Sequence, residues 1–115
     1  MISIGTDIVN IERIKKLVGD KKFLNKIFTY KEIEYCNSYR NPQIHFSGKY
    51  AAKEAVKKAL LSNRIVEDIS MKGIEVLNKP DKSPYIILNS FNHIKCNVTI
   101  SHDGDYAIAF VIIDK

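Results

Sequence analysis

The sequence contains no tryptophan and only two cysteines, three prolines and five glycines among 115 residues. Cys36 and Cys96 lie far apart and outside any CxxC or Cys/His cluster, so neither a zinc site nor a disulfide framework is predicted. No stretch approaches the ~18 apolar residues of a membrane span, and the first residues lack a basic segment followed by an apolar block. We therefore expect a cytoplasmic chain without a membrane span.

The composition is that of a small globular protein with an excess of positive charge. Hydrophobic residues make up 45% and charged residues 27%, a balance that can bury a core. The length suits one compact domain over residues 1–115. Lysine and arginine number 18 against 13 acidic residues, and the resulting formal charge of +5 favours anionic partners. On charge alone, these partners include phosphates, nucleic acids and acidic proteins.

The first half of the chain predicts one strand followed by helices. Residues 2–9 alternate as a short strand does, and residues 11–18 place apolar side chains at helical spacing. Thr29 and Glu32 match a capping box, in which side chains and backbone satisfy each other's hydrogen bonds, so another helix should begin after Thr29.

A long helix is predicted over residues 43–61, because Asn41 can cap it and Pro42 suits its first turn. Small and aliphatic residues spaced by three and four form its buried stripe: Ala52, Ala55, Val56, Ala59 and Leu60. Glu54 lies about 200° from Ala52 around the helix, so we expect it on a charged edge away from the stripe. Four lysines are expected on the solvated face opposite the stripe: Lys49, Lys53, Lys57 and Lys58.

The second half changes to the two-residue period of strands. Strands are predicted at residues 69–77 and 85–88, a short helix at 89–95, and two further strands at 97–101 and 106–113. The predicted fold class is α+β, with an antiparallel sheet packed against helices that include one long central helix.

Three side chains are candidates for chemistry. Asp7 is an unusual residue inside a strand, where an unpaired charge is costly, so a metal ion or a basic partner would account for it. Glu54 precedes Lys58 by four residues, which is also the spacing of an ordinary surface ion pair. His102 follows a predicted strand, at a strand end where ligands often bind, although a loop histidine commonly has no role.

Four segments occur in a characteristic order along the chain. They are GTDIV at 5–9, FTYKE at 28–32, FSGKYAAKEAVKKAL at 46–60 and TISH at 99–102. Together they resemble the 4′-phosphopantetheinyl transferase superfamily, in its short single-domain group, the holo-[acyl-carrier-protein] synthases. The resemblance spans the chain. GTDIV alone is a weak signal, whereas the KEA-centred helix followed by the Ser-His pair is specific.

The resemblance implies a magnesium-dependent enzyme that transfers the phosphopantetheine arm of coenzyme A to a serine of an apo acyl carrier protein and releases 3′,5′-ADP. Asp7 and Glu54 would bind Mg²⁺ and, with Lys53, would be catalytic. Coenzyme A would contact basic and polar residues: Lys49, Lys53, Lys58, Ser101 and His102. The acidic carrier protein would contact the first helix through Arg13, Lys15 and Lys16. The resemblance also implies a homotrimer with active sites between subunits.

Two departures from the family pattern stand out. Lys82-Ser83-Pro84 replaces a frequent Gly-Lys-Pro, and Tyr50 replaces a common Phe or Trp. The proton acceptor stays open between Glu54 and a magnesium-bound water, as does the use of manganese in place of magnesium.

Two alternative functions need no family resemblance. Asp7, Glu54 and His102 would also suit a metal-dependent phosphohydrolase. A basic, non-enzymatic module for acidic partners would fit the charge. Nucleic acid is not an expected partner, because no RNA-binding aromatic motif or recognition helix is present.

Overall fold

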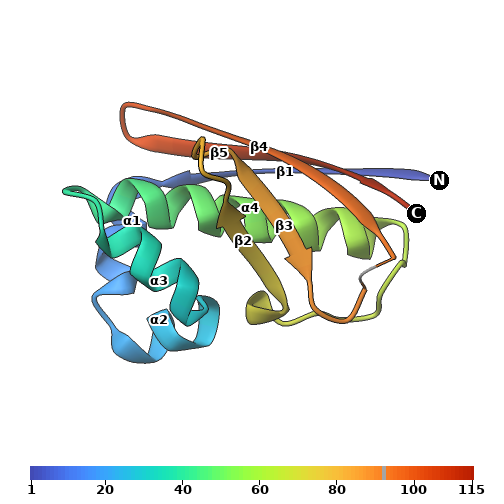
Figure 1. Ribbon diagram of the computed structural model, residues 1–115, viewed down its shortest axis with the longest axis horizontal. Coiled ribbons are helices and arrows are strands. Elements are labelled where there is room, and N and C mark those ends of the chain that lie inside the picture. The colour runs from blue at the N-terminus through green and yellow to red at the C-terminus, as the bar shows by residue number, and fades with distance from the viewer. Residues whose placement is uncertain (92) are drawn as a thin grey trace.

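The computed structural model describes residues 1–91 and 93–115 (Figure 1). A strand opens the chain, helices follow, and strands close it, which confirms the predicted α+β order. The elements are β1 (Ile2–Asn10), α1 (Ile11–Val18), α2 (Lys21–Ile27), α3 (Tyr30–Asn37), α4 (Pro42–Ser62), a 3₁₀ turn (Met71–Gly73), β2 (Ile74–Asn78), β3 (Pro84–Leu88), β4 (Lys95–Asp103) and β5 (Tyr106–Asp114).

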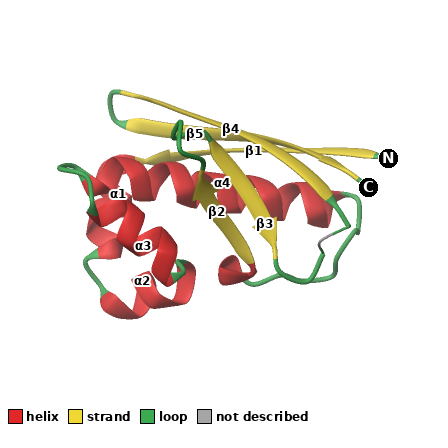
Figure 2. Cartoon of the chain, in the orientation of Figure 1, coloured by secondary structure: helices red, strands yellow, loops and turns green. Residues whose placement is uncertain are grey.

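Helix α4 is the centre of the fold. One antiparallel sheet, in the order β1-β5-β4, lies along one face of α4, and the β2-β3 hairpin lies against a second face (Figure 2). Helices α1, α2 and α3 gather near the N-terminal end of α4 (Figure 1). The helix therefore has most of its circumference covered, and only a limited part of it faces solvent.

Small residues allow α4 to approach the sheet closely. A Cβ at Gly5 of β1 would overlap the Ala55 carbonyl oxygen, and a Cβ at Gly48 would lie 2.9 Å from Ile100 of β4. The N-terminal half of α4 therefore crosses β4, and its C-terminal half crosses β1. The predicted alanine stripe is confirmed, because Ala52 and its neighbours in the stripe are buried against the sheet.

The three-stranded sheet keeps a large apolar surface on its outer face. In β1 the small residues Ser3 and Gly5 face α4, while Ile4 and Ile8 are 61% and 60% exposed. The outer apolar face, as we call it below, consists of Ile2, Ile4, Ile8, Tyr106, Ile108, Phe110 and Ile112. A monomer in water would not normally leave so much contiguous apolar surface exposed.

Two predicted elements differ from the structure. The strand expected at residues 69–77 begins later, because Met71–Gly73 form a 3₁₀ turn. The helix expected at 89–95 is not formed by the described residues there, which make turns until β4 begins at Lys95; residue 92 lies outside the described residues.

Across residues 1–91 and 93–115, none of the helices combines the length and the apolarity of a transmembrane span.

Candidate active site

Asp7 and Lys58 form an ion pair where β1 meets the C-terminal half of α4. The Lys58 ammonium donates to Asp7 Oδ1 at 2.8 Å and to the Thr6 carbonyl at 3.0 Å. The Asp7 side chain is 16% exposed and that of Lys58 is 55% exposed. Asp7 reaches this position because the inner face of β1 carries small residues, so the helix lies directly over the strand. The lysine is the basic partner that accounts for a charge on this strand.

Glu54 lies on the same flank of α4 as Lys58. Tyr50, Glu54 and Lys58 are spaced by four, which aligns their side chains along one edge of the helix. Burial raises the pKa of Tyr50, the negative charges of Glu54 and Asp7 raise it further, and Arg13 lowers it. These charged groups therefore lie close enough to Tyr50 to act on its hydroxyl group. We call Asp7, Glu54 and Lys58 the carboxylate cluster.

The carboxylate cluster contains oxygen ligands of the kind that Mg²⁺ prefers. Carboxylate oxygens are the hard ligands that Mg²⁺ prefers, and this ion commonly uses one or two carboxylates together with phosphates and waters. Asp7 and Glu54 supply two such groups at the edge of the core, and both are partly open to solvent. Lys58 adds a positive charge that would attract an anionic substrate to the same place.

Lys53 is not on a solvated face, contrary to the prediction. Its side chain is fully buried, and its ammonium lies 2.8 Å from Glu32 Oε1. It also donates to the carbonyl oxygens of Met71 and Ile74, at 2.9 and 2.7 Å. An ammonium has three donors, and three partners use them here, so Lys53 has no free donor for a coenzyme A phosphate. Burial lowers the pKa of Lys53, and Glu32 opposes this shift.

Lys49 is likewise buried and bonded within the chain. Its ammonium donates to Val76 O at 2.5 Å and to Asn78 Oδ1 at 2.6 Å, and it lies 4.6 Å from the centre of the Tyr35 ring. Burial lowers the pKa of Lys49. The prediction of an exposed lysine face was wrong for Lys49 and Lys53, because it did not include the β2-β3 hairpin that covers this flank of α4.

Glu32 was predicted only as a helix cap, and the structure gives it a second role. Its Oε1 accepts from the Thr29 amide at 2.8 Å, which confirms the capping box, and its Oε2 accepts from the Val76 amide at 2.7 Å. Glu32 therefore joins α3, α4 and β2 through one carboxylate. The only sequence signal for this role was its place in the segment FTYKE.

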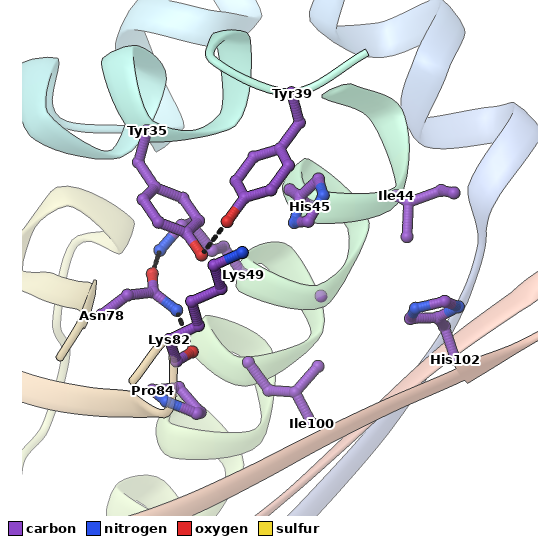
Figure 3. A pocket seen from close by; sticks show the side chains of 11 residues that line it. Tyr35, Tyr39, Ile44, His45, Lys49, Asn78, Lys82, Pro84, Ile100 and His102 are labelled. Atoms are coloured by element: carbon purple, nitrogen blue, oxygen red, sulfur yellow. Dashed lines mark hydrogen bonds between the residues drawn. The ribbon is translucent and has the colours of Figure 1, made fainter. Parts of the chain in front are cut away.

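A cavity of about 290 Å³ opens on the opposite flank of α4 (Figure 3). Its wall on the α3 and α4 side carries Tyr39 and His45, whose rings stack with centroids 3.8 Å apart. The Tyr35 hydroxyl lies 3.0 Å from that of Tyr39. Lys82 from the β2-β3 turn and His102 from β4 line the same cavity. We call this the basic cavity.

Ser101 and His102 lie on opposite faces of β4, because successive strand residues alternate. His102 borders the basic cavity on the inner face. Ser101 pairs with Ile108 on the outer face and borders a smaller hollow of about 200 Å³, which His102 also lines. Within one chain, His102 therefore borders both the basic cavity and the smaller hollow, and Ser101 borders the smaller hollow.

The carboxylate cluster and the basic cavity do not meet within one chain. Nine positions separate His45 from Glu54, which is about two and a half helical turns, so their side chains leave α4 in opposite directions. The structure brings Asp7, Glu54 and Lys58 together on one flank, and it places His102 on the other.

The predicted carrier-binding residues of α1 are exposed. Arg13 lies near the carboxylate cluster, since its charge acts on Tyr50. Lys15 and Lys16 occupy the last turn of α1, and Lys15 borders a hollow of about 300 Å³ beside Phe46. Helix α1 thus presents a positive surface next to the carboxylate cluster.

Comparison with known proteins identifies the class to which this fold and this site belong. Residues 3–111 match the 4′-phosphopantetheinyl transferase superfamily, and the chain belongs to that superfamily. It is 46% identical over 112 residues to the holo-[acyl-carrier-protein] synthase of Thermodesulfovibrio yellowstonii, covering 96% of each chain. The predicted family is therefore confirmed.

Solved structures of the same group share the fold. The holo-[acyl-carrier-protein] synthase of Helicobacter pylori in complex with coenzyme A is 32% identical, with a TM-score of 0.82 over 96% of this chain and 99% of that one. A Chronobacterium ammoniagenes ACPS-CoA complex gives a TM-score of 0.87 at 24% identity, covering 99% of this chain and 97% of that one. The predicted fold class is confirmed by these likenesses.

Proposed function

We propose that this protein is a holo-[acyl-carrier-protein] synthase, which transfers the 4′-phosphopantetheine group of coenzyme A to a serine of an apo acyl carrier protein. The observation that carries the proposal is the carboxylate cluster, which places two carboxylates and one exposed lysine on a chain of this family. Relatives with the same fold bind coenzyme A. In the reaction, the serine oxygen attacks the phosphorus that bears pantetheine, the pyrophosphate P–O bond breaks, and 3′,5′-ADP leaves.

Asp7 and Glu54 would hold Mg²⁺ in this proposal. Bound there, the ion would neutralise negative charge on the pyrophosphate. Lys58 would bind a phosphate oxygen, because its side chain is more than half exposed and its ammonium lies beside Asp7. Lys53 is assigned a positioning role, since its donors hold the polypeptide between Met71 and Ile74 against the helix that carries Glu54.

The nucleotide end of coenzyme A would enter the basic cavity, where His102 and His45 line the walls. Because this cavity and the carboxylate cluster lie on opposite flanks of α4, we propose that one active site uses two subunits. The outer apolar face supplies a surface for assembly, and we propose a homotrimer. Ser101 borders that face and would reach the coenzyme of a neighbouring site.

The acidic carrier protein would bind α1 through Arg13, Lys15 and Lys16, which are exposed beside the carboxylate cluster. Complementary charge speeds encounter and selects partners. We also propose a cytoplasmic location, since Cys36 and Cys96 are both unpaired, as is usual in a reducing compartment.

The test is to incubate the protein with coenzyme A, Mg²⁺ and an apo carrier protein, and then to weigh the carrier. A mass gain of one phosphopantetheine group is expected. Hydrolysis of coenzyme A without carrier modification would instead indicate a phosphohydrolase, and an unchanged coenzyme would indicate a binding module.

Glu54→Gln tests the cluster itself. It should lower the turnover about a hundredfold or more, because a metal ligand that supports transition-state charge is lost. Glu34→Gln is the matched control, since Glu34 is an exposed residue of α3 outside the cluster. Near-normal turnover of Glu54→Gln would remove Glu54 from the site.

A further inference from the structure

Lys82 has a backbone conformation that lysine rarely adopts. Its φ is +74°, in the left-handed region where the β-carbon of an ordinary residue clashes with the backbone. Glycine has no such clash, and glycine is frequent at this position in the family pattern described above. A lysine in this conformation lowers the stability of the folded chain. A functional role for the side chain would explain why it is present.

The turn that contains Lys82 is held from several sides. The Lys82 amide donates to Lys79 O at 2.8 Å, and the Lys79 amide donates to Ser83 O at 2.9 Å. Asn78 Nδ2 donates to Lys82 O at 2.9 Å, and Asn78 Oδ1 accepts from the buried Lys49 ammonium at 2.6 Å. The core therefore fixes the turn through Lys49 and Asn78, and the conformation of Lys82 is set by its surroundings.

The side chain of Lys82 extends along the basic cavity toward Tyr39 (Figure 3). Its ammonium lies 5.8 Å from the centre of the Tyr39 ring, and among the described residues it forms no salt bridge. Lys49, the other lysine of this cavity, is buried and has its ammonium bonded to Val76 and Asn78. Lys82 is therefore the exposed lysine of the cavity.

His45 is a weaker candidate than Lys82 for a permanent positive charge in the cavity. Burial lowers the pKa of His45, and the charges of His102, Lys49 and Lys82 lower it further. These effects disfavour the charged form of His45, and a neutral imidazole offers one donor and one acceptor. For a doubly charged anion in this cavity, Lys82 would therefore supply the exposed positive charge.

We propose that Lys82 binds the 3′-phosphate of coenzyme A and makes the enzyme select coenzyme A over dephospho-coenzyme A. The inference rests on the proposed function. Coenzyme A carries a pyrophosphate and a separate 3′-phosphate on its ribose. The pyrophosphate is the reacting group and belongs at the carboxylate cluster, so the phosphate left for the basic cavity is the 3′-phosphate. The two substrates differ only in this group, so Lys82 would act on specificity rather than on chemistry.

The test compares the KM for coenzyme A with the KM for dephospho-coenzyme A, each with apo carrier protein and Mg²⁺. Lys82→Met removes the charge, and Lys82→Gly also removes the side chain. Both should raise the KM for coenzyme A about tenfold, with kcat and the KM for dephospho-coenzyme A unchanged. Lys79→Met is the matched control, because Lys79 is an exposed lysine of the same turn outside the cavity lining, and it should leave both KM values unchanged.

Thermal unfolding separates binding from stability. Lys82→Gly should melt at a higher temperature than the wild type, because glycine accepts the left-handed conformation, while it still loses affinity for coenzyme A. A lower melting temperature would mean that Lys82 serves the fold, and it would overturn the proposal. Equal changes in both KM values, or no change in either, would also overturn it.

The wild type and the Lys82→Met variant test the proposed function and the role of Lys82 separately. If the wild type does not modify the carrier with coenzyme A, the transferase proposal itself fails. If the wild type modifies the carrier and Lys82→Met keeps the wild-type preference for coenzyme A, only the assignment of Lys82 fails. Binding of 3′,5′-ADP and 5′-AMP, measured by calorimetry, gives the same comparison without turnover.

Discussion

Lys53 and Glu32 form an ion pair of 2.8 Å in which neither side chain has any exposure to solvent. The lysine belongs to α4 and the glutamate to α3, and both also bond the backbone at β2, through Ile74 and Val76. Every charge in this pair has hydrogen-bonded partners, which is the condition under which buried charges are tolerated. The pair therefore holds the β2-β3 hairpin against α3 and α4. Lys53 directly precedes Glu54 in α4, so this anchoring point adjoins the carboxylate cluster.

Removing either partner should destabilise the protein strongly. Lys53→Met leaves the Glu32 carboxylate buried without its counter-charge, and the expected loss is about 3–5 kcal/mol in the free energy of unfolding. Denaturant titration followed by circular dichroism measures it. The double variant Lys53→Met/Glu32→Leu should recover part of the loss, because no unpaired charge remains. Lys57→Met is the control, since Lys57 is a partly exposed lysine of the same helix. A similarly small effect for Lys53→Met and Lys57→Met would contradict the structural role.

His45 should make the stability depend on pH. Its pKa is lowered by burial first and then by the positive charges of His102, Lys49 and Lys82, so the unfolded chain binds a proton at higher pH than the folded chain. Stability should therefore fall as the pH drops below about 6.5, with a slope from this residue of at most about 1.4 kcal/mol per pH unit. His45→Phe keeps a ring beside Tyr39 and removes the titrating group. The wild type should lose more stability than this variant between neutral and mildly acid pH, and parallel curves would show that His45 does not contribute.

The sequence was sufficient for the elements whose signals are local. The capping box at Thr29, the proline that opens α4 and the alanine stripe each specify structure within a few residues, and these predictions were confirmed. Lys49 and Lys53 were misplaced for a non-local reason. Their burial depends on carbonyl groups of a hairpin more than 20 residues away, and helical spacing alone carries no information on what covers a face.

The residues of the candidate site also divide into those that the sequence identifies and those that only the structure reveals. Asp7 and Glu54 were recognised through motifs, and the structure adds that Lys58 pairs with Asp7. The strained Lys82 could be seen in the sequence only as a departure from a family pattern. Its φ and its place in the basic cavity needed coordinates, because the conformation of a turn depends on contacts such as that between Asn78 and Lys49.

Arg13→Glu should weaken binding of the carrier protein while sparing coenzyme A. Arg13 is an exposed residue of α1 beside the carboxylate cluster, where an acidic partner would approach. The KM for the carrier should rise about tenfold at low salt, and the difference from wild type should shrink as salt screens the charges. The KM for coenzyme A should stay the same. Lys31→Glu on α3 is the control for net charge, since Lys31 is exposed and outside the predicted carrier surface. Equal effects of the two variants would assign the result to overall charge instead of to α1.

A site shared between subunits predicts complementation between defective variants. Asp7→Asn damages the carboxylate cluster, and His102→Ala damages the basic cavity on the other flank of α4. If each active site takes its cluster from one subunit and its cavity from a neighbour, mixed oligomers contain some sites in which both parts are intact. Random mixing of equal amounts should give roughly a quarter of such sites.

The measurement is the transfer rate at low coenzyme A concentration, after the two variants are unfolded together and refolded. Activity above the sum of the separately refolded variants is expected, because no intact site can form within either pure oligomer. Ile108→Glu on the outer apolar face should abolish the complementation and lower the molar mass measured by light scattering, since it places a charge on the surface proposed to bury against another subunit. If the activity of the mixture is only the sum of the two variants, one chain holds the whole site. The coenzyme alone would then have to span the distance between the carboxylate cluster and the basic cavity.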